Sequence, residues 1–294
     1  MLSKDTTVLT LFSAVLFFLS VNLHAQPKTL KIWEKNEQLP ATFEFIELAL
    51  SKAEEKYGKY VISTVSADSV DQAFELLNTP EALDVIVSGV EAHRETQAYP
   101  IYIPLDRGLL GFRVCLIQNG NSEQFNSLST AIEFQEHNIS IFVNSAWPDN
   151  HIYRENGFNV EGFKNVPELT NALSKVGNAC FSRSLIEIDS DALRFSELDI
   201  EPNIAFIYPL ADIVYVNKSN KQLQMALEFG LKKAVSDQSF FRLFNKHYEK
   251  VLQKHSFYFR KMFLMRNTDI SSEALDAINK YGIASFNKQS KIDD

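Results

Sequence analysis

Short apolar runs typical of strands alternate with amphipathic helical segments along most of the chain, and this alternation restricts the fold more than any other feature. The first series predicts strands at 29–33, 60–65 and 84–87, with helices at 41–56 and 69–77 between them. In the segment 41–56 apolar side chains recur at helical spacing from Phe45 to Ala53, which predicts one buried face. Strands that alternate with helices indicate a parallel sheet covered on both faces, so the predicted fold class is α/β.

A second series follows, and the last third of the chain is mainly helical. The predicted strands are 112–117, 139–143, 158–163, 178–182, 204–208 and 212–216; the helices are near 131–134, 146–156, 166–176, 221–235 and 240–254; and a tail adds a strand within 258–266 and a helix at 271–281. Two series predict two lobes rather than one wide sheet. Segments of mixed turn and strand character at 106–111 and 208–212 predict a double-crossover hinge, and such a hinge encloses a ligand cleft. We therefore expect residues 26–108 and 209–294 to form lobe 1, and 109–208 to form lobe 2.

The N-terminus has the pattern of an export signal. An apolar run covers 8–23, Lys4 precedes it, and the small residue Ala25 follows it. This pattern predicts a cleavable signal peptide at 1–25 and a mature chain in the periplasm. The alternative is an uncleaved membrane anchor, because Asp5 offsets Lys4 and the run is long for a signal.

Charge and cysteine content exclude several classes of protein. The chain has 29 Lys and Arg against 37 Asp and Glu, a formal net charge of -8, which disfavours nucleic-acid binding. Its two cysteines, Cys115 and Cys180, lack the CxxC spacing of zinc and redox sites. An exported chain allows a disulfide between them, but the geometric demands of such a bond favour two buried free thiols.

Catalytic and cofactor motifs are missing from the sequence. It contains no HExxH, GxSxG, P-loop or GxGxxG pattern, and its paired carboxylates, such as Glu54 and Glu55, fall on the solvent face of a helix. The sequence therefore predicts neither a cofactor nor an enzymatic activity.

Three motifs carry a resemblance to a known family. The stretch Leu83-Asp-Val-Ile-Val-Ser-Gly-Val-Glu-Ala-His-Arg94 is a strand ending in Asp-(apolar)3-Ser-Gly, followed by a polar loop containing Arg. Further along come Val176-Gly-Asn-Ala-Cys-Phe-Ser-Arg-Ser184 and Ala211-Asp-Ile-Val-Tyr-Val-Asn-Lys218. In this order, over about residues 29–252, they resemble periplasmic solute-binding proteins of family 3, the polar amino-acid class. The resemblance implies the two-lobed type 2 periplasmic binding protein fold.

The chain departs from that family where the family holds its ligand. Amino-acid binders of this class use an Arg in the polar loop for the ligand carboxylate and a second-lobe acid for the ammonium. Here Thr96 stands at about the position of that Arg, with Arg94 two residues earlier, and Ser184 stands near the position of the acid. Glu91 replaces a residue that is commonly Ser or Thr.

Strand ends and helix N-termini that face the cleft are the candidate ligand-binding positions. They are Trp33, Glu34, Ser88, Gly89, Glu91, Arg94, Asn144, Ser145, Trp147, Arg183, Ser184 and Tyr208. Arg94 either pairs with a ligand carboxylate or pairs with Glu91 or Glu95 at the surface. Ser145 either helps to hold an anionic group or only caps a helix. Arg113, beside the first crossing, is expected to form a hinge ion pair.

These observations predict a monomeric periplasmic protein that closes on a small polar ligand, with amino acids among the candidates. The resemblance implies an inner-membrane ABC permease or a membrane sensor as its partner. Two alternatives stay open. One is a dehydratase-like or lyase-like enzyme on the same fold that uses Glu34, Glu91 or Arg94, and the other is a sensory or interaction module without a ligand.

Overall fold

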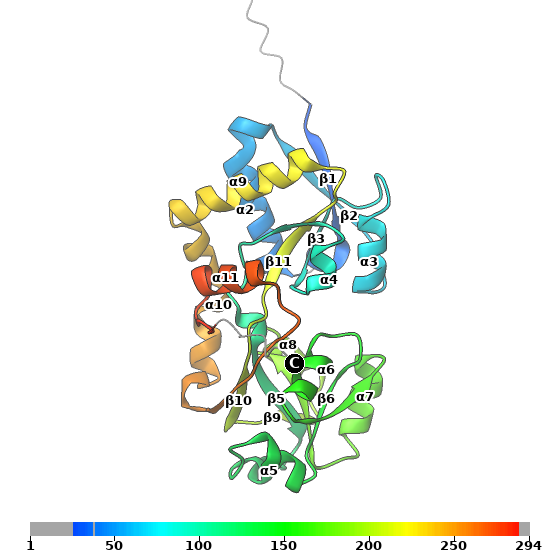
Figure 1. Ribbon diagram of the computed structural model, residues 1–294, viewed down its shortest axis with the longest axis vertical. Helices are drawn as coiled ribbons and strands as arrows, with labels where there is room; N and C mark the ends of the chain where they lie inside the picture. The colour runs from blue at the N-terminus through cyan, green and yellow to red at the C-terminus, as the bar shows by residue number, and fades with distance from the viewer. Residues whose placement is uncertain (1–25, 38, 288–294) are drawn as a thin grey trace, which may run out of the picture.

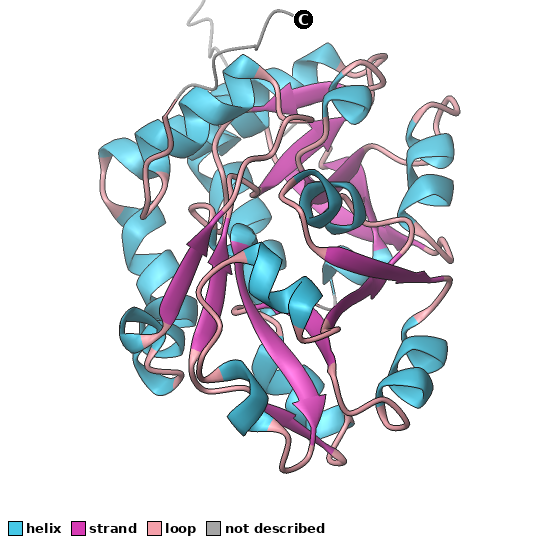
Figure 2. Ribbon diagram, turned by 60° about the horizontal axis from the view of Figure 1, so that its bottom comes forward, coloured by secondary structure: helices cyan, strands magenta, loops and turns pink. Residues whose placement is uncertain are grey.

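The chain forms two α/β lobes, one above the other in Figure 1, and each lobe is built on its own sheet. The computed structural model describes residues 26–37 and 39–287, so the predicted signal peptide at 1–25 lies outside the described residues. The strand order is β2-β1-β3-β11-β4 in the first lobe and β12-β10-β5-β8-β6-β7 in the second, where β9 also pairs with β5. Helices flank the strands of both sheets (Figure 2). The predicted two-lobed α/β class is confirmed.

The sheet of the first lobe is parallel where the first βα series builds it and antiparallel where the chain returns. Its strands are β1 (Lys28–Trp33), β2 (Tyr60–Val65), β3 (Val85–Gly89), β4 (Tyr99–Ile101) and β11 (Asp212–Val216). β1 pairs in parallel with β2 and β3, whereas β11 runs antiparallel to β3 and β4. As a result, the strand that re-enters the lobe lies inside the sheet, between β3 and β4, and its first residue is opposite the end of β3.

Helices cover this sheet, and their contacts explain one glycine. They are α1 (Glu34–Glu37), α2 (Pro40–Tyr57), α3 (Val70–Leu77), α4 (Ala92–Glu95), α9 (Lys221–Ser236) and α10 (Ser239–Lys254). α2 buries the apolar face that the sequence predicts and packs along α9. A Cβ atom at Gly230 of α9 would lie 1.9 Å from the Ala49 carbonyl oxygen, so only glycine allows this close approach. None of the helices within 26–37 and 39–287 is both long and apolar enough to span a bilayer.

The second lobe is a mixed sheet with helices around it. Its strands are β5 (Phe112–Gln118), β6 (Ser140–Asn144), β7 (Asn159–Phe163), β8 (Ala179–Ser184), β9 (Leu198–Ile200) and β10 (Ile204–Ile207), and its helices are α5 (Ala131–Glu136), α6 (Asp149–Glu155), α7 (Val166–Leu173) and α8 (Ile188–Arg194). β6 pairs in parallel with β7 and β8, and β5 runs antiparallel to β8 and β10. The carboxyl ends of β6 and β8 therefore meet at one edge of the lobe.

Cys115 and Cys180 are bonded to each other, so the prediction of two free thiols is wrong. Their Cα atoms are 5.1 Å apart on the neighbouring strands β5 and β8, and both side chains are fully buried. The register explains the error: Cys115 lies opposite Ser182, which places Cys180 diagonally across on the same face. Such a diagonal neighbour is within reach of a disulfide, and no feature of the sequence reveals this pairing.

Over the residues that the structure describes, the chain crosses between the lobes four times. The first two crossings are those predicted from the sequence, and they run side by side: Leu105 N donates to Asp212 O at 2.9 Å, and Gly111 N donates to Leu210 O at 3.1 Å. The tail adds two more. β12 (Lys261–Leu264) pairs in parallel with β10 in the second lobe, and α11 (Ser272–Tyr281) lies back on the first.

The predicted strand and helix of the tail are thus confirmed. The expected boundaries place all of 209–294 in lobe 1, but β12 belongs to the sheet of the second lobe. Several contacts hold the tail. Arg260 is buried and donates to the Ile204 carbonyl oxygen at 3.1 Å. Farther on, Asn267 Nδ2 donates to Pro209 O at 2.9 Å beside the second crossing, and Arg107 Nε donates to Tyr281 O at 2.9 Å. The tail therefore flanks the hinge as a strap.

Candidate ligand-binding site

A cavity of about 700 Å³ lies between the two lobes at the hinge. Its volume is in the range of small-molecule sites. The principal lining residues of the first lobe are Trp33, Lys35, Asn36, Ser88, Gly89, Arg94 and Asp212, and those of the second are Arg113, Trp147, Pro148, Asp149, Arg183, Glu187 and Arg194. Of the twelve candidate residues named from the sequence, six line it: Trp33, Ser88, Gly89, Arg94, Trp147 and Arg183.

The wall formed by the first lobe is centred on Arg94, which α4 directs back onto the end of β3. Its Nη1 donates to Ser88 Oγ at 3.0 Å and to the Gly89 carbonyl oxygen at 3.3 Å. It also forms an ion pair with Glu91 at 2.6 Å. Arg94 has only 4% of its surface exposed, and its Nε has no hydrogen-bond partner within the described part of the chain. Arg94 is therefore not a surface residue, although it does form the ion pair with Glu91 that the sequence suggested.

Glu91 lies behind this wall rather than in it. Burial raises the pKa of the Glu91 carboxyl to about 7, against the opposing effect of the Arg94 guanidinium. At neutral pH the pair therefore exists partly as an arginine beside a protonated acid. In that state Arg94 keeps a surplus positive charge next to the cleft.

Asn36 also lines the cavity, and it is not among the candidate residues named from the sequence. Its amide exchanges two hydrogen bonds with the backbone of Val87, at 2.8 and 2.9 Å, and so takes the place of a further strand beside β3. Trp33, which also lines the cavity, donates from Nε1 to Ala67 O at 3.1 Å. Glu34 is not among the lining residues. Its carboxylate accepts a hydrogen bond from the Ser66 hydroxyl.

In the second lobe a buried cluster positions Arg113. Its Nη2 lies 2.6 Å from Asp149 Oδ1, and its Nε donates to the Tyr208 hydroxyl at 2.8 Å. That hydroxyl in turn donates to Asp149 at 2.6 Å. Burial by itself would lower the pKa of Arg113, but the Asp149 carboxylate outweighs it and raises the pKa above its ordinary value. Arg113 is therefore a permanent cation in the cleft, and Tyr208, a candidate residue, supports it from behind.

Arg183 is held by both charge and stacking. It pairs with Asp191 of α8 and, at 3.2 Å, with Glu187 just before that helix. Its guanidinium lies 4.8 Å from the centre of the Trp147 ring, a cation–π distance. The second lobe thus presents two arginines and a tryptophan face toward the first.

Three candidate residues of the second lobe have other roles. Ser184 Oγ donates to the Leu109 carbonyl oxygen at 3.2 Å, Ser145 Oγ donates to the Phe163 carbonyl oxygen at 2.8 Å, and Asn144 Oδ1 accepts from Ala146 N at 2.9 Å. Of the two alternatives for Ser145, the helix cap is wrong, because the helix begins at Asp149 rather than at 146. The turn after β6 makes the difference: it continues for four residues and brings Asp149 to the cleft.

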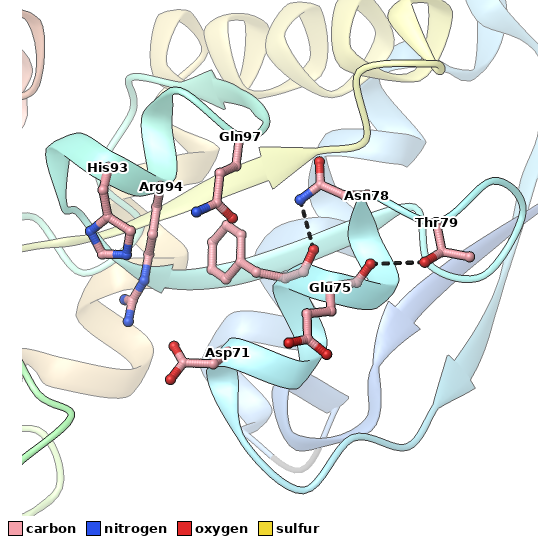
Figure 3. A pocket seen from close by; sticks show the side chains of 8 residues that line it. Asp71, Glu75, Asn78, Thr79, His93, Arg94 and Gln97 are labelled. Atoms are coloured by element: carbon pink, nitrogen blue, oxygen red, sulfur yellow. Dashed lines mark hydrogen bonds between the residues drawn. The ribbon is translucent and has the colours of Figure 1, made fainter.

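A second, smaller pocket of about 510 Å³ is also lined by Arg94. Figure 3 shows Asp71 and Glu75 of α3 on one side of it, and His93, Arg94 and Gln97 on the other. Asp71 and Glu75 are exposed. Arg94 therefore contributes to the linings of both pockets.

Comparison with known proteins supports the fold. No protein-family model and no curated protein matches the chain. Among solved structures, an ancestral amino-acid-binding protein described as a precursor of cyclohexadienyl dehydratase matches with a TM-score of 0.54 and 12% identity, over 75% of this chain and 95% of that one. A Salmonella typhimurium periplasmic binding protein with high arginine specificity matches with a TM-score of 0.53 and 11% identity, over 75% of this chain and 99% of that one. An ancestral arginine-binding protein matches with a TM-score of 0.51 and 14% identity, over 75% of this chain and 98% of that one.

At these identities the likeness defines a class of fold. The chain has the two-lobed type 2 fold of periplasmic solute-binding proteins of the polar amino-acid class, as the resemblance of its motifs implied.

Proposed function

We propose that the chain is an extracytoplasmic solute-binding protein that encloses a small polar ligand between its lobes. The observation that carries the proposal is the interlobe cavity of about 700 Å³, to which both lobes bring guanidinium groups: Arg94 from the first, and Arg113 and Arg183 from the second. Charged groups on opposite walls of a hinged cleft favour closure on a polar molecule that contacts both. Amino acids are the leading ligand class.

Arg94 is the proposed anchor for an anionic group of the ligand. It is buried, its position is fixed by Ser88 and Gly89, and its partner Glu91 has a pKa of about 7. A guanidinium offers two parallel donors to a carboxylate. Trp33 and Trp147 supply apolar surface on the two sides of the same cavity.

Export to the periplasm belongs to this proposal. The N-terminal pattern predicts a cleaved signal peptide, and the disulfide between Cys115 and Cys180 is of the kind that persists in an oxidising compartment. A protein of this kind works as a monomer that delivers its ligand to an ABC permease or a membrane sensor. Intact-mass analysis of the fractionated protein should find a periplasmic species that begins at Gln26, whereas a full-length membrane-bound species would contradict export.

An enzyme on the same fold is the second candidate, and one observation favours it. The Glu91 carboxyl has a pKa of about 7 and lies 2.6 Å from an arginine of the cleft wall, so it could exchange a proton near neutral pH. Against this, Glu91 does not line the cavity. Binding requires no turnover, so product formation with a bell-shaped pH profile would decide for the enzyme.

The test of the binding function is a thermal-shift screen of the mature protein against amino acids, amines and small organic acids. A ligand that binds only the native state raises the melting temperature. Small-angle scattering with each hit should then show a smaller radius of gyration than without it. If no compound shifts the melting temperature, or if the scattering profile stays the same at saturation, the proposal fails.

A further inference from the structure

One acid of the cleft has a carboxyl group without a partner among the described residues. Asp212 opens β11 at the end of the second crossing and lies opposite Gly89 in the register with β3. It is partly buried, and the surface it exposes faces the cavity. Throughout 26–37 and 39–287, no hydrogen bond or ion pair engages its carboxyl group; its hydrogen bonds are those of its backbone, from its N–H to Asp106 and to its carbonyl oxygen from Leu105 N.

Three of the four arginines that line the same cavity differ in this respect. Arg94 has Glu91, Arg113 has Asp149, and Arg183 has Asp191 and Glu187 as partners. Each of these three guanidinium groups therefore has an acidic partner before any ligand arrives. Lys35 and Arg194 also line the cavity, where Lys35 Nζ donates to the Asp68 carbonyl oxygen and Arg194 lies over the Phe195 ring. Among the acids of the lining, Asp212 is the one whose carboxyl has no such partner in the described part of the chain.

A second acid lies directly beside it. Asp106, in the first crossing, is almost fully buried and accepts three backbone N–H groups: those of Gly108 at 3.2 Å, Leu110 at 2.6 Å and Asp212 itself at 3.1 Å. Three N–H donors favour the ionised carboxylate. Asp106 therefore holds the two crossings together as an anion, and its charge opposes ionisation of Asp212.

The other groups around Asp212 only partly offset this effect. Burial and the Asp106 carboxylate raise the pKa of Asp212 well above its ordinary value, and Glu187 of the second lobe acts in the same direction. Arg113 and Arg94 oppose them from their own ion pairs. Burial also raises the pKa of Asp106, to about 6, against its backbone donors, while Tyr248 of α10 keeps its phenol proton.

We propose that Asp212 receives a cationic group of the ligand, an ammonium or a guanidinium, and that its carboxyl releases its proton when that group binds. The inference rests on the proposed ligand-binding function and deepens it: the ligand is an amine-bearing molecule, and its cation lies at the hinge, between Arg94 on one lobe and Arg113 on the other. The family to which the chain bears a resemblance uses a second-lobe acid for the ammonium, where this chain has Ser184. Asp212 supplies the missing acid from a different element.

The sign of the pH effect follows from this assignment. A cation beside Asp212 stabilises the ionised carboxylate and lowers its pKa, so binding releases a proton wherever the free protein holds one. Affinity for a cationic ligand should therefore rise with pH until Asp212 is ionised in the free protein as well. An anionic group at the same place would have the opposite effect, because it would favour the protonated acid.

The test uses titration calorimetry with the standard L-amino acids and, for each one that binds, the analogue in which a hydroxyl replaces the α-ammonium. Each titration is performed at pH 6.5 in phosphate and in imidazole, whose ionisation enthalpies differ strongly. For an amine that binds, we expect a buffer-dependent enthalpy whose sign shows proton release, and at least tenfold weaker binding of the hydroxyl analogue. This measurement needs no variant.

Two variants then test whether the released proton comes from Asp212. Asp212→Asn should remove the buffer dependence and weaken binding at pH 8 at least tenfold, whereas Glu161→Gln, at an exposed acid of β7, should leave both unchanged. Binding without proton release, or binding that Asp212→Asn leaves within twofold of wild type, overturns the inference but leaves the binding function intact. If only organic acids bind, the assignment of a cationic group is wrong. If neither amines nor acids bind, the proposed function itself fails.

Discussion

Arg113 and Asp149 form a buried ion pair, 2.6 Å between Nη2 and Oδ1, that joins β5 to the start of α6 under the cleft. Tyr208 closes the cluster with hydrogen bonds to both partners. The cluster therefore has two tasks: it packs the second lobe, and it fixes one of the charges that a ligand meets.

Removal of one partner should reveal the structural task. We expect Asp149→Ala to lower the free energy of unfolding by about 3 to 5 kcal/mol, because Arg113 would remain buried and uncompensated. The matched control is Lys246→Ala, which breaks the exposed pair with Glu44 and should cost no more than about 1 kcal/mol. Urea unfolding of both variants measures the difference; equal losses would show that the buried pair is not special.

Arg94 should matter for the ligand more than for the fold. Arg94→Ala should weaken binding of the ligand found by screening by about 2 to 4 kcal/mol, from the loss of a charge-assisted pair in a closed cleft. Arg94→Lys should recover only part of this, since an ammonium cannot form the two parallel bonds of a guanidinium. Calorimetry decides: binding of Arg94→Ala within about fivefold of wild type, roughly 1 kcal/mol, would move the anchor to Arg183 or Arg113.

Glu91 makes stability depend on pH in a predictable direction. Burial raises the pKa of its carboxyl from 4.5 to about 7, so the folded state binds more protons than the unfolded state between these values. The stabilisation is complete below pH 4.5 and is lost as the pH rises through 7. Between pH 5 and pH 8 the wild type should therefore lose more stability than Glu91→Gln, in urea unfolding at the two pH values. Equal losses would show that Glu91 titrates normally.

The disulfide should contribute through the loop that it closes. Cys115 and Cys180 are 65 residues apart in the sequence, and loop-closure entropy for that separation predicts about 4 kcal/mol of stabilisation. The double variant Cys115→Ala/Cys180→Ala should lose up to this amount, and the oxidised wild type should show no reactive thiol after unfolding. A reactive thiol in the unfolded, unreduced protein would contradict the bond.

The strap should restrict how far the lobes open. Four Gly and Ser residues inserted between Ile270 and Ser271 would lengthen the fourth crossing, and we expect a larger radius of gyration without ligand and an unchanged one with ligand. The same insertion after Gly120, in an exposed turn of the second lobe, serves as the control. An identical ligand-free scattering profile for both insertions would show that the tail exerts no restraint.

Local patterns were sufficient for the elements and for part of the site. The strands that end at Ser88-Gly89 and at Ser184, both crossings and the tail elements were predictable, because apolar periodicity and turn residues act over a few positions. Trp33 and Arg183 were found in the same way, since each lies at the end of a predicted strand. Trp147 was found at the start of a predicted helix, and Arg94 through the polar loop of the family that the sequence resembles.

What the sequence did not reveal depends on partners that are distant along the chain. Asp149 and Asp212 become cleft residues only through a longer turn after β6 and through the pairing of β11 with β3. For Arg113 we expected a hinge ion pair, but its pair with Asp149 lies within the second lobe, and the same guanidinium lines the cavity. The Cys115–Cys180 bond depends on strand register in the same way. The sequence did give one hint that Asp212 is a cleft residue, because Asp212 lies within the predicted second crossing at 208–212.

The route of the chain has a consequence for folding. Because β12 pairs with β10, the sheet of the second lobe is completed by residues 261–264, which follow the whole of the first lobe's sheet in the sequence. Neither lobe is one continuous piece of chain, so the two should unfold in a single cooperative transition rather than one after the other. During synthesis that edge of β10 would remain unpaired until residues 261–264 have emerged. Domains that fold as they are made usually begin at the N-terminus, but here the sheet of the second lobe is completed only after every strand of the first lobe has been made.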